Sequence, residues 1–480
     1  MSDLAFTDAI AQAELVRRGD ASSPELVEAA ITRVEKLNPE LNAVIHPRFE
    51  TARAEAAGDL PDGPFRGVPI VIKDLDGYSA GDPLHMGTRF LKNAGWIASG
   101  DSYLIAKLKA AGFVIVGKTN TPELGLLPTT EPLSYGASHN PWDVTRSPGG
   151  SSGGSAVAVA SGMVPVGHAG DGGGSIRIPG SACGLFGFKP ARGRVSLGPD
   201  SAESWGGLVA RHVLTRSVRD SAAVLDVLAG EMPGDPYIAP PPARPLAEEV
   251  GADPGRLRFG LRTRAPRFVG VDTHPDCIAA AEDAARLLES LGHEVVPVAL
   301  DEVDDPGAME DFGLLLAAWV ASDVEDLATL VGRAPAQDEI EPGTWMYAEL
   351  GNAVTAAQYI RSLERLRQWN RSLARDWLAA GIDALITPTM IIPPPKLGEM
   401  ATTGDDVGAL GLAAAMAGLT APFSVTGQPA MSVPLAWNAD DVPIGVQIVA
   451  PTYREDLLIR IATQLEIAQP WTDRLPPVHA

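Results

Sequence analysis

Cysteine is almost absent from this sequence of 480 residues, which contains only Cys183 and Cys277. Two cysteines cannot build a disulfide framework, and their separation does not match the ligand spacing of a zinc site. Because reducing compartments hold proteins without disulfides, the composition predicts a cytoplasmic protein.

Basic residues are also scarce: 38 lysines and arginines face 60 aspartates and glutamates, which leaves a formal net charge of −22. Contacts with nucleic-acid phosphates require lysine and arginine, so this balance argues against a nucleic-acid partner. The excess of acid favours solubility and says little about the fold.

One long span, 407–437, carries no charge, but Pro422, Gln428 and Pro429 interrupt it. A membrane helix needs about 20 consecutive apolar residues, so we expect a buried helix, a turn and a strand here instead. The first residues, 1–5, lack the basic and apolar regions of a secretory leader. The sequence therefore predicts a soluble protein with no membrane partner.

Helical and strand-like patterns alternate along the chain, which is typical of an α/β fold. Helical spacing fills residues 5–44, with Ser22 or Ser23 as a cap. Short apolar runs predict strands at 67–72, 113–116, 257–261, 294–298, 383–387, 431–435 and 445–449. Further helices are expected at about 102–111, 276–291 and 455–467, and over most of 302–380.

Two segments are rich in glycine and serine: 149–155 reads GGSSGGS and 171–177 reads DGGGSIR. Such segments are usually flexible linkers. Here an apolar run follows the first segment, and no Asp, Glu, Lys or Arg occurs between Arg146 and Asp171, which predicts burial. A buried loop has to satisfy its polar backbone groups, so the two segments point to one site.

The second segment has the elements of a hydrolase site. Ser175 is a candidate nucleophile, and backbone N–H groups of the glycines before it can stabilise an oxyanion. Three residues remain open as the base: His168, between the two segments, and Lys73 and Lys118, each at the end of an apolar run. Burial can lower the pKa of such a lysine enough to supply a neutral amine. The alternatives are a structural histidine and ion-paired lysines.

Residues 149–180 resemble the core of the amidase signature family, in which GGSSGGSA is followed after about fifteen residues by a D-x-GGSIR-x-P turn. Further motifs similar to those of the family occur in the same order along nearly the whole chain. They are GVPIVIKD at 67–74, GKTNTPE at 117–123, GFKP at 187–190, GQPA at 427–430 and PIGVQ at 443–447.

The resemblance implies a Ser–cis-Ser–Lys triad and an acyl-enzyme. Ser175 matches the nucleophile, Ser151 the bridging serine after a cis peptide bond, and Lys73 the general base. The oxyanion hole matches the nitrogens of Gly172, Gly173, Gly174 and Ser175. Three residues are expected to support the site: Ser152, together with Asp171 and Arg177, which can pair across the turn. A purely structural role is the alternative for Asp171 and Arg177.

One position departs from the family pattern. Gly172 stands where family members usually carry a side chain, and this change is expected to loosen the turn without removing its N–H groups. Lys118 matches a family motif but not the base. All three triad positions are present.

The resemblance also implies a large mixed β-sheet with helices on both faces, in one amidase domain over residues 1–480. We expect an N-terminal helical segment, a signature core, a Pro-rich loop, a βαβ unit with helices around the substrate pocket, and a C-terminal part that completes the sheet. The N-terminal segment covers 1–62, the signature core 63–230 and the Pro-rich loop 231–256. The βαβ unit with its helices covers 257–380, and the C-terminal part covers 381–480.

Three other classes of protein are alternatives to this interpretation. An α/β-hydrolase would use Ser151 as nucleophile, since GGSSG at 149–153 satisfies G-x-S-x-G, but it requires a preceding strand where 140–148 is predicted as loop. An amidotransferase subunit that liberates ammonia from glutamine usually carries an acidic residue where 415–422 is apolar. A scaffold without activity is the third alternative.

The chain looks most like the branch of the family that contains cyclic-dimer hydrolases and bacterial aryl acylamidases. This resemblance predicts hydrolysis of small linear, cyclic or aryl amides, with esters and carbamates (urethanes) as side substrates. The apolar segment 407–425 and the aromatic residues within 312–347 suggest a pocket for an apolar acyl amide, and the alternative is that both segments are simply core. No metal or organic cofactor is implied, and a homodimer is a possible assembly because family members are often homodimers.

Overall fold

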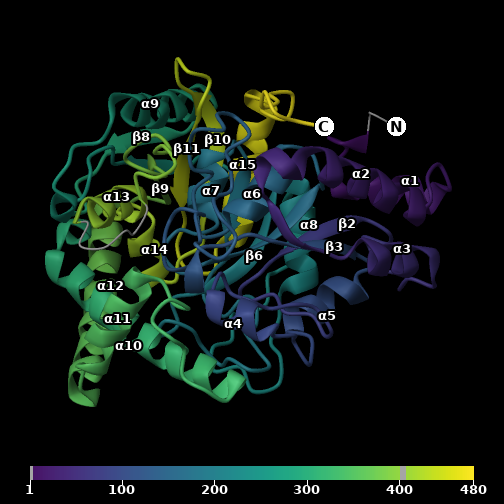
Figure 1. The fold of residues 1–480 in the computed structure, drawn as a ribbon. Helices are drawn as coiled ribbons and strands as arrows, with labels where there is room; N and C mark the ends of the chain where they lie inside the picture. Colours follow the sequence, from purple (N-terminus) through teal and green to yellow (C-terminus); the bar gives the residue numbers. More distant parts are fainter. Residues whose placement is uncertain (1–3, 401–406) are drawn as a thin grey trace.

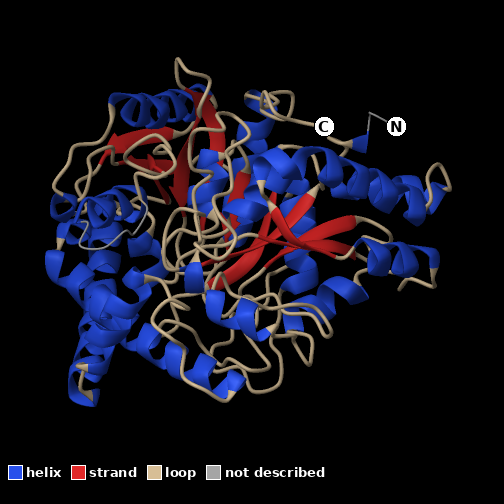
Figure 2. Ribbon diagram, viewed as in Figure 1, coloured by secondary structure: helices blue, strands red, loops and turns tan. Residues whose placement is uncertain are grey.

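The central feature of the fold is a mixed β-sheet, drawn in red in Figure 2. The structure is a computed structural model and describes residues 4–400 and 407–480. Residues 1–3 and 401–406 lie outside the described residues, so most of the segment 1–5, which was compared with a secretory leader above, is among them. Eleven strands in the described residues follow the order β1-β3-β2-β4-β6-β5-β10-β11-β9-β7-β8. Their bounds are β1 Val44–Pro47, β2 Pro69–Lys73, β3 Val114–Thr119, β4 Val166–Asp171, β5 Phe186–Lys189, β6 Ala210–Thr215, β7 Arg258–Leu261, β8 Glu294–Pro297, β9 Ala384–Pro388, β10 Ala430–Trp437 and β11 Pro443–Val449.

Parallel and antiparallel pairs share this sheet, which confirms the predicted mixed architecture. β2 runs parallel to β3 and β4, and β7 runs parallel to β8 and β9, whereas the other neighbours are antiparallel. The sequence did not predict the strands β1, β4, β5 and β6. β4 contains Gly167 and Gly170, and β6 contains the buried polar residues Arg211 and His212, so neither reads as an apolar run.

Helices cover both faces of the sheet (Figure 1). In β2, Ile70 and Ile72 belong to a core cluster with α5, α8, α9 and α15, whereas Val71 belongs to a cluster with α2 and α6. A strand buried on both faces reads as a continuous apolar run, which is why the sequence predicted β2. The helices outside the bundle described next are α1 Ala9–Arg18, α2 Ser23–Leu41, α3 Phe49–Ala57, α4 Arg89–Ala94, α5 Tyr103–Ala110, α6 Gly153–Ala160, α7 Arg177–Ala182, α8 Val218–Leu228, α9 Pro275–Ser290, α13 Val407–Ala417, α14 Ala421–Val425 and α15 Glu455–Ala468.

Three further helices, α10 (Pro306–Val331), α11 (Pro342–Asn352) and α12 (Ala356–Ala380), form the green bundle at the left of Figure 1. They confirm the helical prediction for 302–380. α10 begins after the N-cap Asp305, and α12 begins with a capping box in which Thr355 pairs with Gln358. α10 packs against both other helices. Residues on another of its faces line the cavity described below.

The uncharged span 407–437 contains α13, α14 and β10, as predicted. Among the helices in the described part of the chain, none combines the length and the apolarity needed to cross a bilayer. The expected domain and its segment boundaries stay predictions.

Candidate active site

The two lysines that the sequence left open as bases lie in neighbouring strands and have different partners. Lys118 Nζ lies 2.6 Å from Asp74 Oδ1 and donates to the carbonyl of Pro83 at 2.7 Å. Lys118 and Asp74 are both fully buried. Lys118 is thus an ion-paired strand lysine, one of the alternatives that the sequence left open.

Lys73, the last residue of β2, contacts the first glycine-rich turn. Its Nζ atom lies 2.7 Å from Ser151 Oγ, and both side chains are buried. Burial lowers the pKa of Lys73 to about 8, although the anions of Asp76 and Asp171 act in the opposite direction. A lysine with this pKa is largely neutral in mildly alkaline solution and can accept a proton.

Ser151 lies two residues before α6, in a turn that is tightly packed against Thr129. The Gly150–Ser151 peptide bond is cis, as the family resemblance implies. A Cβ atom at Gly150 would lie 2.4 Å from the carbonyl oxygen of Thr129. Ser152 ties the turn to β4, because its hydroxyl donates to the Gly170 carbonyl and accepts from the Gly170 N–H, both at 3.3 Å.

The second turn, 172–175, joins β4 to α7 and holds Ser175. The chain from 147 to 172 is buried, which confirms that these turns are not linkers. The absence of a side chain at Gly172 makes room for Trp205, since a Cβ atom there would lie 2.7 Å from the indole ring. The turn is therefore tightly packed, and the loosening expected at Gly172 is not found.

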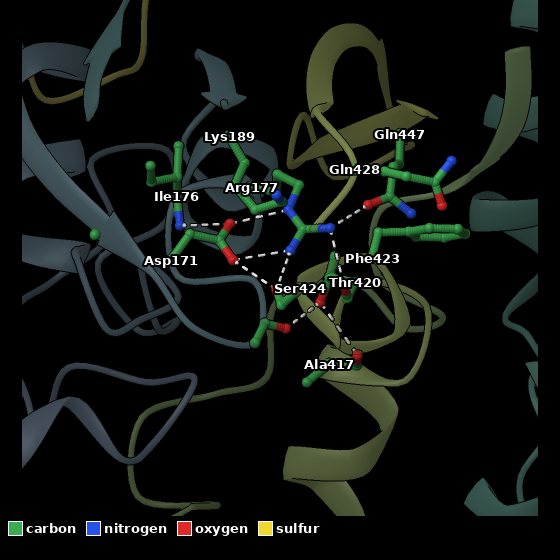
Figure 3. A network of polar contacts seen from close by, with 12 residues as sticks. Asp171, Ile176, Arg177, Lys189, Ala417, Thr420, Phe423, Ser424, Gln428 and Gln447 are labelled. Carbon is green, nitrogen blue, oxygen red and sulfur yellow. Dashed lines mark hydrogen bonds and ion pairs between the residues drawn. The ribbon is translucent and has the colours of Figure 1, made fainter. Parts of the chain in front are cut away.

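A buried ion pair closes the second turn, as Figure 3 shows. Arg177 donates to the two carboxylate oxygens of Asp171 at 2.9 and 2.8 Å, which confirms the predicted pairing. Burial acts to raise the pKa of Asp171, but Arg177 outweighs it and the pKa is lowered. Asp171 also accepts the N–H of Ile176 at 3.3 Å. The guanidinium reaches three residues that are distant in sequence, namely Thr420, Ser424 and Gln447.

One cavity of about 490 Å³ is lined by Lys73, Ser151 and Ser175 together. The two serine-bearing turns therefore meet at one site, as predicted. Backbone of the second turn also lines this cavity, at Gly172. Apolar side chains form much of the remaining wall, among them Met86, Trp96, Leu124, Trp205, Leu327 and Leu330.

The wall of the cavity bears on the two roles, pocket and core, that the sequence left open for 407–425 and for the aromatic residues within 312–347. α10 contributes Asp323, Asp326, Leu327 and Leu330, which share one helix face at spacings of three and four residues. The aromatic residues named for this role are outside the lining; they are partly buried and pack against core clusters, and they are Phe312, Trp319, Trp345 and Tyr347. The described residues of 411–425 are also outside the lining. A run of apolar or aromatic residues does not reveal which helix face will meet a cavity.

A charged pair beside Lys73 was missed by sequence reasoning. Asp76 accepts a hydrogen bond from Arg211 Nε at 2.9 Å, and both residues line the cavity. Burial acts to raise the pKa of Asp76, but Arg211 and then His168 outweigh it and lower the pKa to about 2. The sequence pattern that could have indicated this pair is an aspartate three positions after Lys73, and such a pattern is not specific.

His168 lies behind this pair. It is fully buried, with Nε2 3.8 Å from Asp76 Oδ1, and burial lowers its pKa to about 4. The ring is not part of the cavity lining. The structure thus gives His168 the environment of a neutral structural histidine, one of the alternatives left open.

The cavity therefore combines the side chain of Ser175, a lysine that can accept a proton, and part of a glycine turn. These are the groups that acyl transfer requires. Within residues 4–400 and 407–480, no three histidine, cysteine, aspartate or glutamate side chains are placed to share a metal ion.

Comparison with known proteins finds relatives over almost the full chain. The model of the amidase family matches residues 25–459. The chain is 43% identical to the 6-aminohexanoate-cyclic-dimer hydrolase of Paenarthrobacter ureafaciens over 480 residues, which cover 98% of this chain and 96% of that protein.

Solved structures give the same result. The structure of 6-aminohexanoate cyclic dimer hydrolase complexed with substrate matches with a TM-score of 0.95 at 42% identity, covering 99% of this chain and 100% of that one. A bacterial aryl acylamidase of the amidase signature family matches with a TM-score of 0.88 at 25% identity, covering 100% and 99%. Family model, relatives and fold agree, and the chain belongs to the amidase signature family, whose enzymes hydrolyse amide bonds.

Proposed function

We propose that this amidase is a serine hydrolase that cleaves small linear, cyclic or aryl amides through an acyl-enzyme, with Ser175, Ser151 and Lys73 as its triad. The observation that carries the proposal is the 2.7 Å contact between Lys73 Nζ and Ser151 Oγ in the cavity that Ser175 also lines. A buried lysine whose pKa is lowered to about 8, bonded to a hydroxyl at a cavity wall, has the perturbed titration that is typical of functional sites.

In the proposed first step, Ser175 Oγ bonds to the substrate carbonyl carbon while its proton passes to Ser151 and the proton of Ser151 passes to Lys73. The carbonyl electron pair moves onto oxygen, where the N–H groups of residues 172–175 stabilise it. Collapse of this intermediate breaks the C–N bond, and the proton returns through Ser151 to the leaving nitrogen. Water then cleaves the acyl ester by the same proton path.

The size and lining of the cavity support small substrates. Its volume of about 490 Å³ lies within the usual range for small-molecule pockets, and apolar side chains form much of its wall. The relatives act on a cyclic dimer of 6-aminohexanoate and on aryl acylamides, as their names state. We propose the same substrate class here, with esters and urethanes as side substrates.

A panel of amides, anilides, esters and urethanes that share one acyl group tests this function. We expect turnover of anilides and simple amides, because a serine nucleophile with a proton relay can expel an amine. Esters should react at least as fast, since their leaving group needs less protonation. Lack of turnover on every amide and anilide would contradict the proposal.

Charge on the substrate should also matter, because α10 places Asp323 and Asp326 in the cavity wall. Burial, and then Asp326, raise the pKa of Asp323 to about 7, so that its charge develops between pH 6 and pH 8. Like charges about 10 Å apart repel by about 1.7 kcal/mol at an effective dielectric constant near 20. At pH 8.5 we therefore expect anilides with a distal carboxylate to have kcat/KM about 10- to 20-fold below neutral analogues of equal length.

Anilides of one chain length that end in ammonium, methyl or carboxylate make this comparison. Asp323→Asn removes the negative charge and should reduce the difference in kcat/KM between the methyl and carboxylate substrates. A change from pH 8.5 to pH 6 should reduce the same difference, because Asp323 becomes protonated. Equal kcat/KM for the three substrates in the parent enzyme would refute the charge preference without affecting the assignment as an amidase.

The amidotransferase alternative has less support. The relative described above, 43% identical over nearly the whole chain, is a hydrolase by name, and the residues expected to hold the glutamine amino group are apolar at 415–422. Glutamine hydrolysis stimulated by a second subunit would favour the alternative. The cytoplasmic location and a homodimeric assembly stay predictions.

A further inference from the structure

A threonine from the C-terminal part of the chain contacts the glycine turn that the proposed function uses as the oxyanion hole. Thr420 Oγ1 donates to the carbonyl of Gly173 at 2.7 Å, although 247 positions separate the two residues (Figure 3 shows the threonine). The same oxygen lies 3.1 Å from the carbonyl of Ala417. The hydroxyl has one proton, and the shorter contact is the one to Gly173.

The peptide plane links this contact to the oxyanion hole. The carbonyl of Gly173 and the N–H of Gly174 belong to one planar peptide unit, so an anchor on the carbonyl also sets the direction of the N–H. Gly174 has φ +139°, a region that side chains disfavour, and a Cβ atom there would lie 2.2 Å from Thr420 Oγ1. The turn and the threonine are therefore in direct contact at this peptide.

Thr420 is itself held in place. It is fully buried, and its carbonyl accepts a hydrogen bond from Arg177 Nη1 at 2.9 Å. Its N–H donates to the carbonyl of Ala417 at 3.0 Å. The carbonyl of the preceding residue, Leu419, accepts from Gln447 Nε2 at 2.8 Å. A hydroxyl on so fixed a backbone is a preorganised support for the turn.

We infer that Thr420 is a positioning residue that aims the Gly174 N–H at the oxyanion formed when Ser175 attacks the substrate. This inference rests on the proposed function. Because the negative charge exists only in the transition state and the tetrahedral intermediate, a misaimed donor should slow the reaction and leave substrate binding nearly unchanged.

The experiment compares Thr420→Val, which keeps the shape and removes the hydroxyl, with Thr420→Ser, which keeps the hydroxyl. Loss of one complete oxyanion donor costs about 10²- to 10³-fold in kcat, so a misaimed donor should cost about 10- to 100-fold. We expect Thr420→Val to show this loss with KM within about threefold, and Thr420→Ser to restore most of the rate.

Two further measurements distinguish positioning from a general structural role. A trifluoromethyl ketone adds a serine hydroxyl reversibly and forms a tetrahedral oxyanion, so its affinity should fall in Thr420→Val by about the same factor as kcat/KM. Active sites are counted by the endpoint of fluorophosphonate labelling, so that rates refer to folded enzyme. Thr426→Val is the matched control, because the hydrogen bonds of the Thr426 hydroxyl within the described part of the chain are with nearby backbone, at Phe423 and Gln428.

Unchanged kcat and ketone affinity in Thr420→Val would overturn the inference, and so would a loss explained entirely by fewer labelled sites. Equal losses in Thr420→Val and Thr426→Val would also overturn it. Failure of the proposed function is distinguishable, because in that case Ser175→Ala remains active whatever Thr420→Val does.

Discussion

Ser175→Ala is expected to lower kcat for an anilide substrate by about 10⁴- to 10⁶-fold, since the bond to the acyl group can no longer form. Ser175 is partly exposed at the cavity wall, so removal of its hydroxyl leaves the core intact. Steady-state kinetics gives the rate, and the thermal unfolding midpoint checks that the variant is folded.

Labelling with a fluorophosphonate gives an independent readout of the same prediction. The parent enzyme should be labelled at Ser175, and Ser175→Ala should not be labelled. If Ser151 were the nucleophile, as G-x-S-x-G at 149–153 suggests, Ser175→Ala would keep near-normal turnover and labelling. That result would reverse the assignment of the two serines.

The second large effect concerns Lys73 and pH. The neutral amine is the form that accepts a proton, and the pKa of Lys73 is about 8, so kcat/KM should rise with pH through this value. The neutral fraction grows about ninetyfold between pH 6 and pH 9. Lys73→Arg, which stays protonated, should abolish the reaction while keeping the positive charge.

Asp76→Asn tests the cause of this pH profile. The carboxylate of Asp76 raises the pKa of Lys73 and neutralises Arg211, whose charge lowers it. Loss of the carboxylate removes the contribution that raises this pKa and leaves the charge of Arg211 in place, so the midpoint of the profile should move to lower pH. A rate that falls as the pH rises from 6 to 8 in the parent enzyme would exclude lysine as the base.

Local sequence already determined much of the site. Glycines within 149–155 and 171–177 encode tight turns, since a Cβ atom at Gly150 or at Gly174 would clash with neighbouring atoms, and the lack of charge between the two segments encodes burial. Apolar runs such as 67–72 specified strands, because a strand buried on both faces cannot carry polar residues at every second position. With the family motifs, these features were sufficient to name both serines and the lysine.

Apolar runs alone did not separate the two lysines, because both lie at the ends of such runs. The family motifs matched only Lys73 to the base, and the tertiary structure gives the two lysines different partners. Strand register places Ile72 opposite Lys118, and this lysine meets Asp74, whereas Lys73 meets Ser151. Likewise, Asp323 reaches the cavity through the rotation of α10 about its axis, and Thr420 reaches Gly173 across 247 positions. Backbone conformation is encoded by neighbouring residues, whereas contacts between distant segments depend on strand order and on which helix face packs inward.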